Sequence, residues 1–155
     1  MTTKRLIEAA VIAAVYAVLT IALAPISYGM MQVRISEALT VLPFFTPAAV
    51  PGLFVGCLVS NLLSPYGLPD LIFGSMASLL AAVGSYLLRK RPILVPLPPV
   101  LANGILVGAM LYYVYEVPVS LPVSILWVAA GEMLACYGLG YPLMRYLRKY
   151  KGIFG

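Results

Sequence analysis

Apolar stretches of about the length that a helix needs to cross a bilayer, roughly 20 residues, follow one another along the whole sequence. The clearest are residues 6–24, 70–88, 100–115 and 123–144. Only 10% of the residues are charged, whereas a water-soluble domain has about 25%, so lipid is the expected solvent. The 155 residues leave room for about six such helices with short loops. We therefore predict one all-α integral membrane domain over residues 1–155.

The apolar stretch from 35 to 63 is less regular than the others. Three prolines interrupt it, Pro43, Pro47 and Pro51, which predicts two short helices over about 35–48 and 51–63. Each would be about 20 Å long at 1.5 Å per residue, less than the ~30 Å of a hydrocarbon core. The two segments either span a thinned bilayer or enter it as a re-entrant hairpin, and the sequence leaves both arrangements open.

Basic residues set the predicted orientation, because cytoplasmic loops carry an excess of Lys and Arg. With six crossings and the N-terminus inside, Arg34 lies outside and all other basic residues lie inside: Lys4, Arg5, Arg89, Lys90, Arg91, Arg145, Arg148, Lys149 and Lys151. Both termini are therefore predicted to be cytoplasmic. Because these clusters sit at membrane edges, we expect no binding of nucleic acid.

Glu132 lies deep in the last predicted helix, about 15 Å from its outer end by helical rise. A carboxylate at such a depth costs on the order of 3 kcal/mol, so it should face a cavity or a partner. Asn103 lies at a similar depth in the preceding helix, and the adjacent Gly131 and Gly104 would leave room for a ligand. The alternative is a Glu132–Asn103 hydrogen bond that serves packing alone.

Other polar residues are expected near the outer face: Gln32, Arg34, Glu37, Asn61 and Asp70. Arg34, Glu37, Asn61 and Asp70 would form the rim of a funnel whose floor is Asn103 and Glu132. Capping by Asp70 or an Arg34–Glu37 pair would also explain some of them. Tyr113 and Trp127 are available to cover a planar ligand. Carboxylates and amides suit a solute rich in N–H donors and do not suit a phosphate, which would need several basic side chains.

Enzymatic chemistry finds little support in the sequence. The chain has no histidine, which removes the usual zinc motif and the Ser–His pair. It has a single aspartate, Asp70, so an aspartyl dyad is not possible. Cys57 and Cys136 lie in apolar runs and are interpreted as packing residues. We predict a non-enzyme with no cofactor and no metal site.

The first helix carries alanines at a spacing of four, which lets two helices pack closely. The residues of these two stripes are Ala9, Ala13 and Ala17, and Ala10 and Ala14. Internal packing is one interpretation, and docking to a separate membrane protein is the other. The sequence contains no nucleotide-binding loop, so any ATP dependence must come from other subunits.

The segment 32–45, QVRISEALTVLPFF, resembles the signature of the QueT family, the substrate-binding (S) components of energy-coupling factor (ECF) transporters for queuosine precursors. The likeness extends through 67–74, GLPDLIFG, and through Gly56-Cys57, Asn61, Asn103-Gly104 and Gly131-Glu132. It therefore covers nearly the whole chain. The signature at 32–45 is specific, whereas the alanine spacing alone is not.

The resemblance implies a subunit of a prokaryotic plasma-membrane importer. Such a subunit binds its substrate on the outer side, docks on a transmembrane coupling subunit with two ATPases, and topples to carry its site to the cytoplasm. The alanine stripes Ala9, Ala13 and Ala17, and Ala10 and Ala14, would be the docking surface. The implied substrate is 7-aminomethyl-7-deazaguanine or a close relative.

One carboxylate can accept the adjacent N–H and NH₂ donors of a guanine-like edge, with Glu132 the first choice and Glu37 the second. The aminomethyl ammonium would pair with Asp70 or Glu37, and Asn61 and Asn103 would serve the ring carbonyl and nitrogen. Two other readings stay open: the same fold with another vitamin or nucleobase as ligand, and a small oligomeric channel. The sequence does not fix which precursor is bound, or whether the ATPases are shared.

Overall fold

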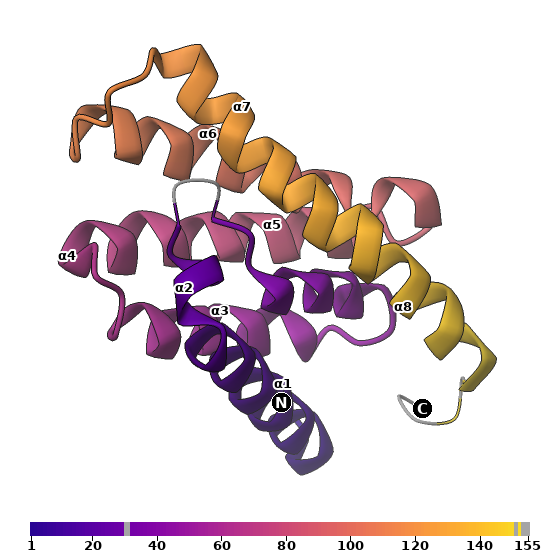
Figure 1. The fold of residues 1–155 in the computed structure, drawn as a ribbon. Helices are drawn as coiled ribbons and strands as arrows, with labels where there is room; N and C mark the ends of the chain where they lie inside the picture. The colour runs from indigo at the N-terminus through magenta and orange to yellow at the C-terminus, as the bar shows by residue number, and fades with distance from the viewer. Residues whose placement is uncertain (30–31, 151, 153–155) are drawn as a thin grey trace.

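Every element is helical over residues 1–29, 32–150 and 152, the part of the chain that the computed structural model describes (Figure 1). Lys151, one of the basic residues used to orient the chain, lies outside the described residues. In chain order the elements are α1 (Thr3–Ala22), α2 (Ala24–Ser27), η1 (Ile35–Phe44), α3 (Ala49–Asn61), α4 (Gly67–Pro69), η2 (Asp70–Gly74), α5 (Ser75–Leu87), η3 (Pro92–Leu94), α6 (Leu97–Tyr113), α7 (Leu121–Met133), η4 (Leu134–Gly140), α8 (Tyr141–Leu147) and η5 (Arg148–Tyr150).

Four helical runs among the described residues are long and apolar enough to cross a membrane. They are Thr3–Ala22, Gly67–Leu87, Pro92–Tyr113 and Leu121–Tyr150. Over the described residues the all-α prediction is confirmed, and the four runs are consistent with the multi-pass membrane character that the sequence predicts. The prediction of six crossings and the orientation of the termini stay predictions.

The two segments around the internal prolines form short helices, as predicted. The first, η1, is a 3₁₀ helix of 10 residues that includes Pro43, and the second, α3, is an α-helix of 13 residues. Each is about 20 Å long by its helical rise. Both the thinned-bilayer and the hairpin arrangement therefore stay open.

Several predicted helix boundaries are wrong, and prolines explain one of them. The apolar stretch 100–115 predicts a helix that begins at residue 100, but α6 already begins at Leu97, with Pro98 and Pro99 in its first turn. Proline is tolerated there because the first turn needs no backbone N–H donor. Asp70 was expected to open its helix or cap it, but the helix begins at Gly67 and Asp70 makes no capping bond.

The distribution of polarity is the reverse of that in a water-soluble protein. Large apolar side chains such as Val18, Leu80 and Leu126 are more than half exposed. Polar side chains are instead buried on nearly every long element: Thr20, Ser36, Glu37, Thr40, Asn61, Asp70, Ser75, Ser78, Asn103, Ser124 and Glu132. The surface is thus suited to lipid, and the chemistry lies inside.

Helices α1 and α3 approach closely through small residues. A Cβ atom added at Gly52 would lie 2.8 Å from the Ala9 carbonyl oxygen, and one at Gly56 would lie 2.8 Å from that of Ala13. The stripe of Ala9, Ala13 and Ala17 is therefore turned inward, which is the internal-packing interpretation of this motif. On the other stripe, Ala10 and Ala14 are exposed.

Candidate functional site

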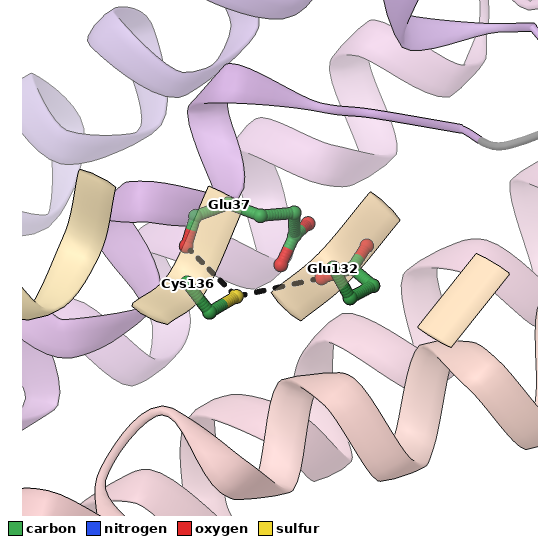
Figure 2. A group of neighbouring side chains, drawn as sticks. All are labelled: Glu37, Glu132 and Cys136. Carbon is green, nitrogen blue, oxygen red and sulfur yellow. Dashed lines mark hydrogen bonds between the residues drawn. The ribbon is translucent and has the colours of Figure 1, made fainter. Parts of the chain in front are cut away.

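Two buried carboxylates face one another where η1 packs on η4, next to the end of α7. Glu37 comes from η1 and is 0% exposed, and Glu132 comes from the end of α7 and is 2% exposed. One oxygen of each carboxylate and the sulfur of Cys136 all lie within 4.8 Å of one another. Figure 2 shows the Glu37 carboxylate directed toward Glu132, with Cys136 beside both. We call Glu37, Glu132 and Asn103 the carboxylate site.

The thiol of Cys136 ties the two carboxylate residues together. It lies 3.5 Å from Glu132 Oε2 and 3.6 Å from the backbone carbonyl oxygen of Glu37, close enough to donate to either (Figure 2). Thr40 Oγ1 lies 3.6 Å from the same sulfur. Cys136 was interpreted from sequence as a packing residue. The structure shows that it is also a polar neighbour of the site, which its apolar sequence surroundings gave no way to foresee.

Asn103, on α6, completes the site with an amide. It is 5% exposed and interacts electrostatically with both Glu37 and Glu132, while its Nδ2 has no hydrogen-bond partner among the described residues. The predicted proximity of Asn103 and Glu132 is therefore confirmed. The predicted role of Gly104 is wrong, because Ala129 fills its free space: a Cβ there would lie 3.1 Å from the Ala129 Cβ. Gly104 lets α6 and α7 approach.

Tyr16 reaches the same site from α1, and the sequence analysis missed it. Its hydroxyl donates a hydrogen bond to Glu37 Oε1, and its side chain is 0% exposed. One turn later, Thr20 Oγ1 lies 2.6 Å from Ser36 Oγ on η1. A tyrosine and a threonine four residues apart lie on one face of a helix, so this pair in an otherwise apolar span was a usable signal.

Arg34 and Asp70 form a buried ion pair, with 3.1 Å between Arg34 Nη2 and Asp70 Oδ2. Arg34 also donates to Gln32 Oε1 at 3.2 Å, and its guanidinium lies 5.4 Å from the centre of the Tyr28 ring. Asn61 Nδ2 donates to the Asp70 carbonyl oxygen at 3.1 Å. The structure therefore brings together three of the four predicted rim residues with Gln32, and we call these the Arg34 cluster: Gln32, Arg34, Asn61 and Asp70.

Glu37 is the rim residue that the structure places elsewhere. The sequence offered an Arg34–Glu37 pair, and that pairing is wrong, because Arg34 bonds Asp70 and Glu37 bonds Tyr16. The physical reason is local. Arg34 precedes η1 in an extended conformation, with φ −91° and ψ 107°, so the side-chain geometry of residues three apart in a helix does not apply.

The buried charges do not balance. Among the described residues, Arg34 is the one buried cation, and it stands against three buried carboxylates, Glu37, Asp70 and Glu132. Arg34 is already bonded to Asp70. Glu37 Oε2 has no hydrogen-bond partner in the described part of the chain. A buried acceptor without a partner is costly, so the carboxylate site is suited to a ligand that brings N–H donors or positive charge.

Glu37, Glu132 and Cys136 could also hold a small metal ion, because one oxygen of each carboxylate and the cysteine sulfur lie close enough to share one. Nothing in their geometry prefers a metal to an N–H donor, so the predicted absence of a metal site stays a prediction.

The two aromatic residues predicted to cover a ligand lie at the surface. Tyr113 is 68% exposed and Trp127 is 36% exposed, and their role stays a prediction. A different aromatic pair connects the loops at this end of the molecule: Tyr115 donates its hydroxyl to the Tyr66 carbonyl oxygen, and the two ring centres are 4.8 Å apart.

A groove lies on the outside of α7 and η4, away from the carboxylate site. This groove of about 760 Å³ is lined by Leu126, Met133, Leu134, Tyr137 and small residues. It contains no carboxylate or amide side chain, and it belongs to the apolar surface rather than to the buried polar interior. It is therefore not a candidate for binding a polar solute.

Comparison with known proteins adds a family. The sequence model of the family described as QueT transporter matches residues 6–149. A curated protein of Lactococcus lactis subsp. cremoris (strain MG1363), the "Queuosine precursor transporter QueT", is 37% identical over 79 residues. That alignment covers 50% of this chain and 46% of the relative, so the chain spans less than half the length of the relative that it matches. No solved structure matches the chain significantly.

Proposed function

The chain belongs to the QueT transporter family, and from this premise we propose that it is the substrate-binding subunit of an ECF-type, ATP-dependent importer. It captures a queuosine precursor, 7-aminomethyl-7-deazaguanine or a close relative, from outside a prokaryotic cell. It would do so as a multi-pass protein of the plasma membrane. Support comes from the family, from the printed name of the relative, and from the four apolar helical runs.

The observation that carries the proposal is the carboxylate site, which holds two buried acidic side chains with no ion-pair partner in the described part of the chain. A guanine-like edge presents adjacent N–H and NH₂ groups that one carboxylate can accept together, and we assign this role to Glu132. Asn103 supplies an amide to the ring. The ammonium of the ligand is assigned to Glu37 rather than Asp70, because Asp70 is already bonded to Arg34.

The proposal is tested by purifying the protein from its native host and identifying the released small molecule by mass spectrometry. We expect 7-aminomethyl-7-deazaguanine or a close relative, in about one copy per protein. Titration of the empty protein should then give saturable binding of that compound, with guanine as a weaker competitor and riboflavin and biotin as non-competitors. Release of another vitamin, or solute flux through liposomes that contain this chain alone, would contradict the proposal.

Partner docking is assigned to the exposed alanines of α1. Ala10 and Ala14 face outward at the spacing that allows close helix packing, whereas Ala9 and Ala13 are used against α3. We expect Ala14→Leu to lower ATP-dependent uptake several-fold in liposomes that also contain the coupling subunit and ATPases. Ligand binding by the isolated chain should not change, because Ala14 does not contribute to the carboxylate site.

The matched control is Ala130→Leu, a substitution of an equally exposed alanine on α7. It should leave both uptake and binding as in the wild type. Normal uptake with Ala14→Leu would reject this surface of α1 as the docking site.

A further inference from the structure

The hydrogen bond from Tyr16 fixes how the Glu37 carboxylate is presented to the site. Tyr16 donates to Oε1, and Oε2 is left without a hydrogen-bond partner among the described residues. The tyrosine itself is held in place, because its Cβ packs directly against Gly56 of α3. The contact is so close that a Cβ atom added at Gly56 would lie only 2.9 Å from the Tyr16 Cβ. One oxygen is thus occupied and the other has no such partner, while the carboxylate as a whole is directed toward Glu132 (Figure 2).

A hydroxyl that donates to a carboxylate also favours its ionised form. This matters here because Glu37 and Glu132 face one another in a buried site, and two like charges at such a distance disfavour each other. The buried cation that could offset the repulsion, Arg34, is bonded to Asp70. Cys136 does not replace the tyrosine, since its thiol lies near the Glu37 backbone carbonyl and the Glu132 carboxylate.

Building on the proposed function, we propose that Tyr16 is a positioning residue that holds Glu37 as an ionised acceptor for the ammonium of the ligand. It thereby sets the preference of the site for a cationic ligand over a neutral one of the same shape. Glu132 and Asn103 bind the ring of the ligand, and Glu37, held in position by Tyr16, binds its ammonium group. The first helix is then part of the binding site.

The test compares two ligands on one protein. The cationic probe is 7-aminomethyl-7-deazaguanine, and the neutral probe is 7-deazaguanine, which has the same ring edge and no ammonium. Tyr16→Phe keeps the ring and removes only the hydroxyl. We expect its affinity for the cationic probe to fall about 10- to 30-fold, as for a lost hydrogen bond to a charged group, while its affinity for the neutral probe changes less than about threefold, since that probe makes no charge contact.

The matched control is Thr20→Val, which removes a buried hydroxyl from the same face of α1. Thr20 bonds Ser36 and the Tyr16 carbonyl oxygen and does not touch Glu37. Its affinity for both probes should stay as in the wild type. A second check is the Glu37→Gln background, in which Tyr16→Phe should cause no further loss of discrimination, because the charge that Tyr16 presents is already gone.

The outcomes separate this inference from the function on which it rests. If Tyr16→Phe loses affinity for both probes equally, Tyr16 has only a structural role. This result would overturn the inference and leave the proposed function standing. If Tyr16→Phe does not purify as a folded protein, the Glu37→Gln variant is used for the test instead. Its affinity for the cationic probe must fall more than its affinity for the neutral probe, and equal losses of affinity for the two probes overturn the inference. A wild-type protein that binds neither probe overturns the proposed function, and the inference fails with it.

Discussion

Replacing Glu132 with glutamine is expected to weaken binding of 7-aminomethyl-7-deazaguanine by about 30- to 200-fold, the effect of losing a charged hydrogen-bond partner in a buried site. The carboxylate of Glu132 is 2% exposed and is the assigned acceptor for two adjacent donors of the ring edge. Glutamine keeps the size of the side chain but offers one oxygen and one NH₂ group. The glutamine oxygen can still accept one of the two ligand bonds, but the NH₂ group would face the second ligand donor, so that bond is lost and the contact becomes repulsive.

Isothermal titration of the purified protein in nanodiscs measures this change directly. Glu116→Gln is the matched control, since Glu116 is exposed in the loop before α7 and should bind the ligand as the wild type does. The ring-edge assignment is rejected if Glu132→Gln and the wild type give the same affinity while the protein remains folded.

Replacing Asp70 with asparagine should lower the free energy of unfolding by about 3–5 kcal/mol, the usual cost of removing one partner from a buried ion pair. Arg34 is 4% exposed and Asp70 is 0% exposed, so the change would leave a buried guanidinium charge without its carboxylate partner. The remaining acceptors of Arg34 are neutral and cannot replace the carboxylate: Gln32 Oε1, the Ser27 carbonyl oxygen and Cys57 Sγ. Thermal unfolding in a mild detergent would show the loss as a lower midpoint.

The control for this prediction is the double variant Arg34→Gln with Asp70→Asn. Removing both charges is less damaging than removing one, so the double variant should unfold at a higher temperature than Asp70→Asn alone. If Asp70→Asn unfolds within about 0.5 kcal/mol of the wild type, the range expected of a surface substitution, the Arg34–Asp70 pair does not hold the fold together.

The apolar segments were predictable because bilayer thickness sets helix length, and four of them are long helical runs in the structure. Glu132 and Asn103 were also predictable as a pair, since depth follows from counting residues along a helix. The Arg34–Asp70 pair was not, because the partners are 36 residues apart in the chain and several acidic residues were available at the same membrane face. Single-sequence spacing contains no information on which of them Arg34 contacts.

Local backbone geometry accounts for other errors. The inward position of Glu37 depends on the extended conformation of Arg34 and on a 3₁₀ helix over Ile35–Phe44, and a sequence-based reading treats such a segment as a regular α-helix. Tyr16 was overlooked because a tyrosine in an apolar span is ordinarily a packing residue or an interfacial one. Its role becomes visible only when η1 is placed beside α1.

The first helix, α1, lies between the carboxylate site and the surface on which a partner protein would dock. Ala14 and Tyr16 are two residues apart, which is about 200° of rotation around a helix axis, so one side of α1 touches Glu37 while the opposite side is exposed. A protein that seats on Ala10 and Ala14 would stand roughly 10 Å, one helix diameter, from the carboxylate. Any tilt or shift that this partner imposed on α1 would change the geometry of the hydrogen bond from Tyr16 to Glu37. Partner docking on α1 would therefore change the affinity for the solute.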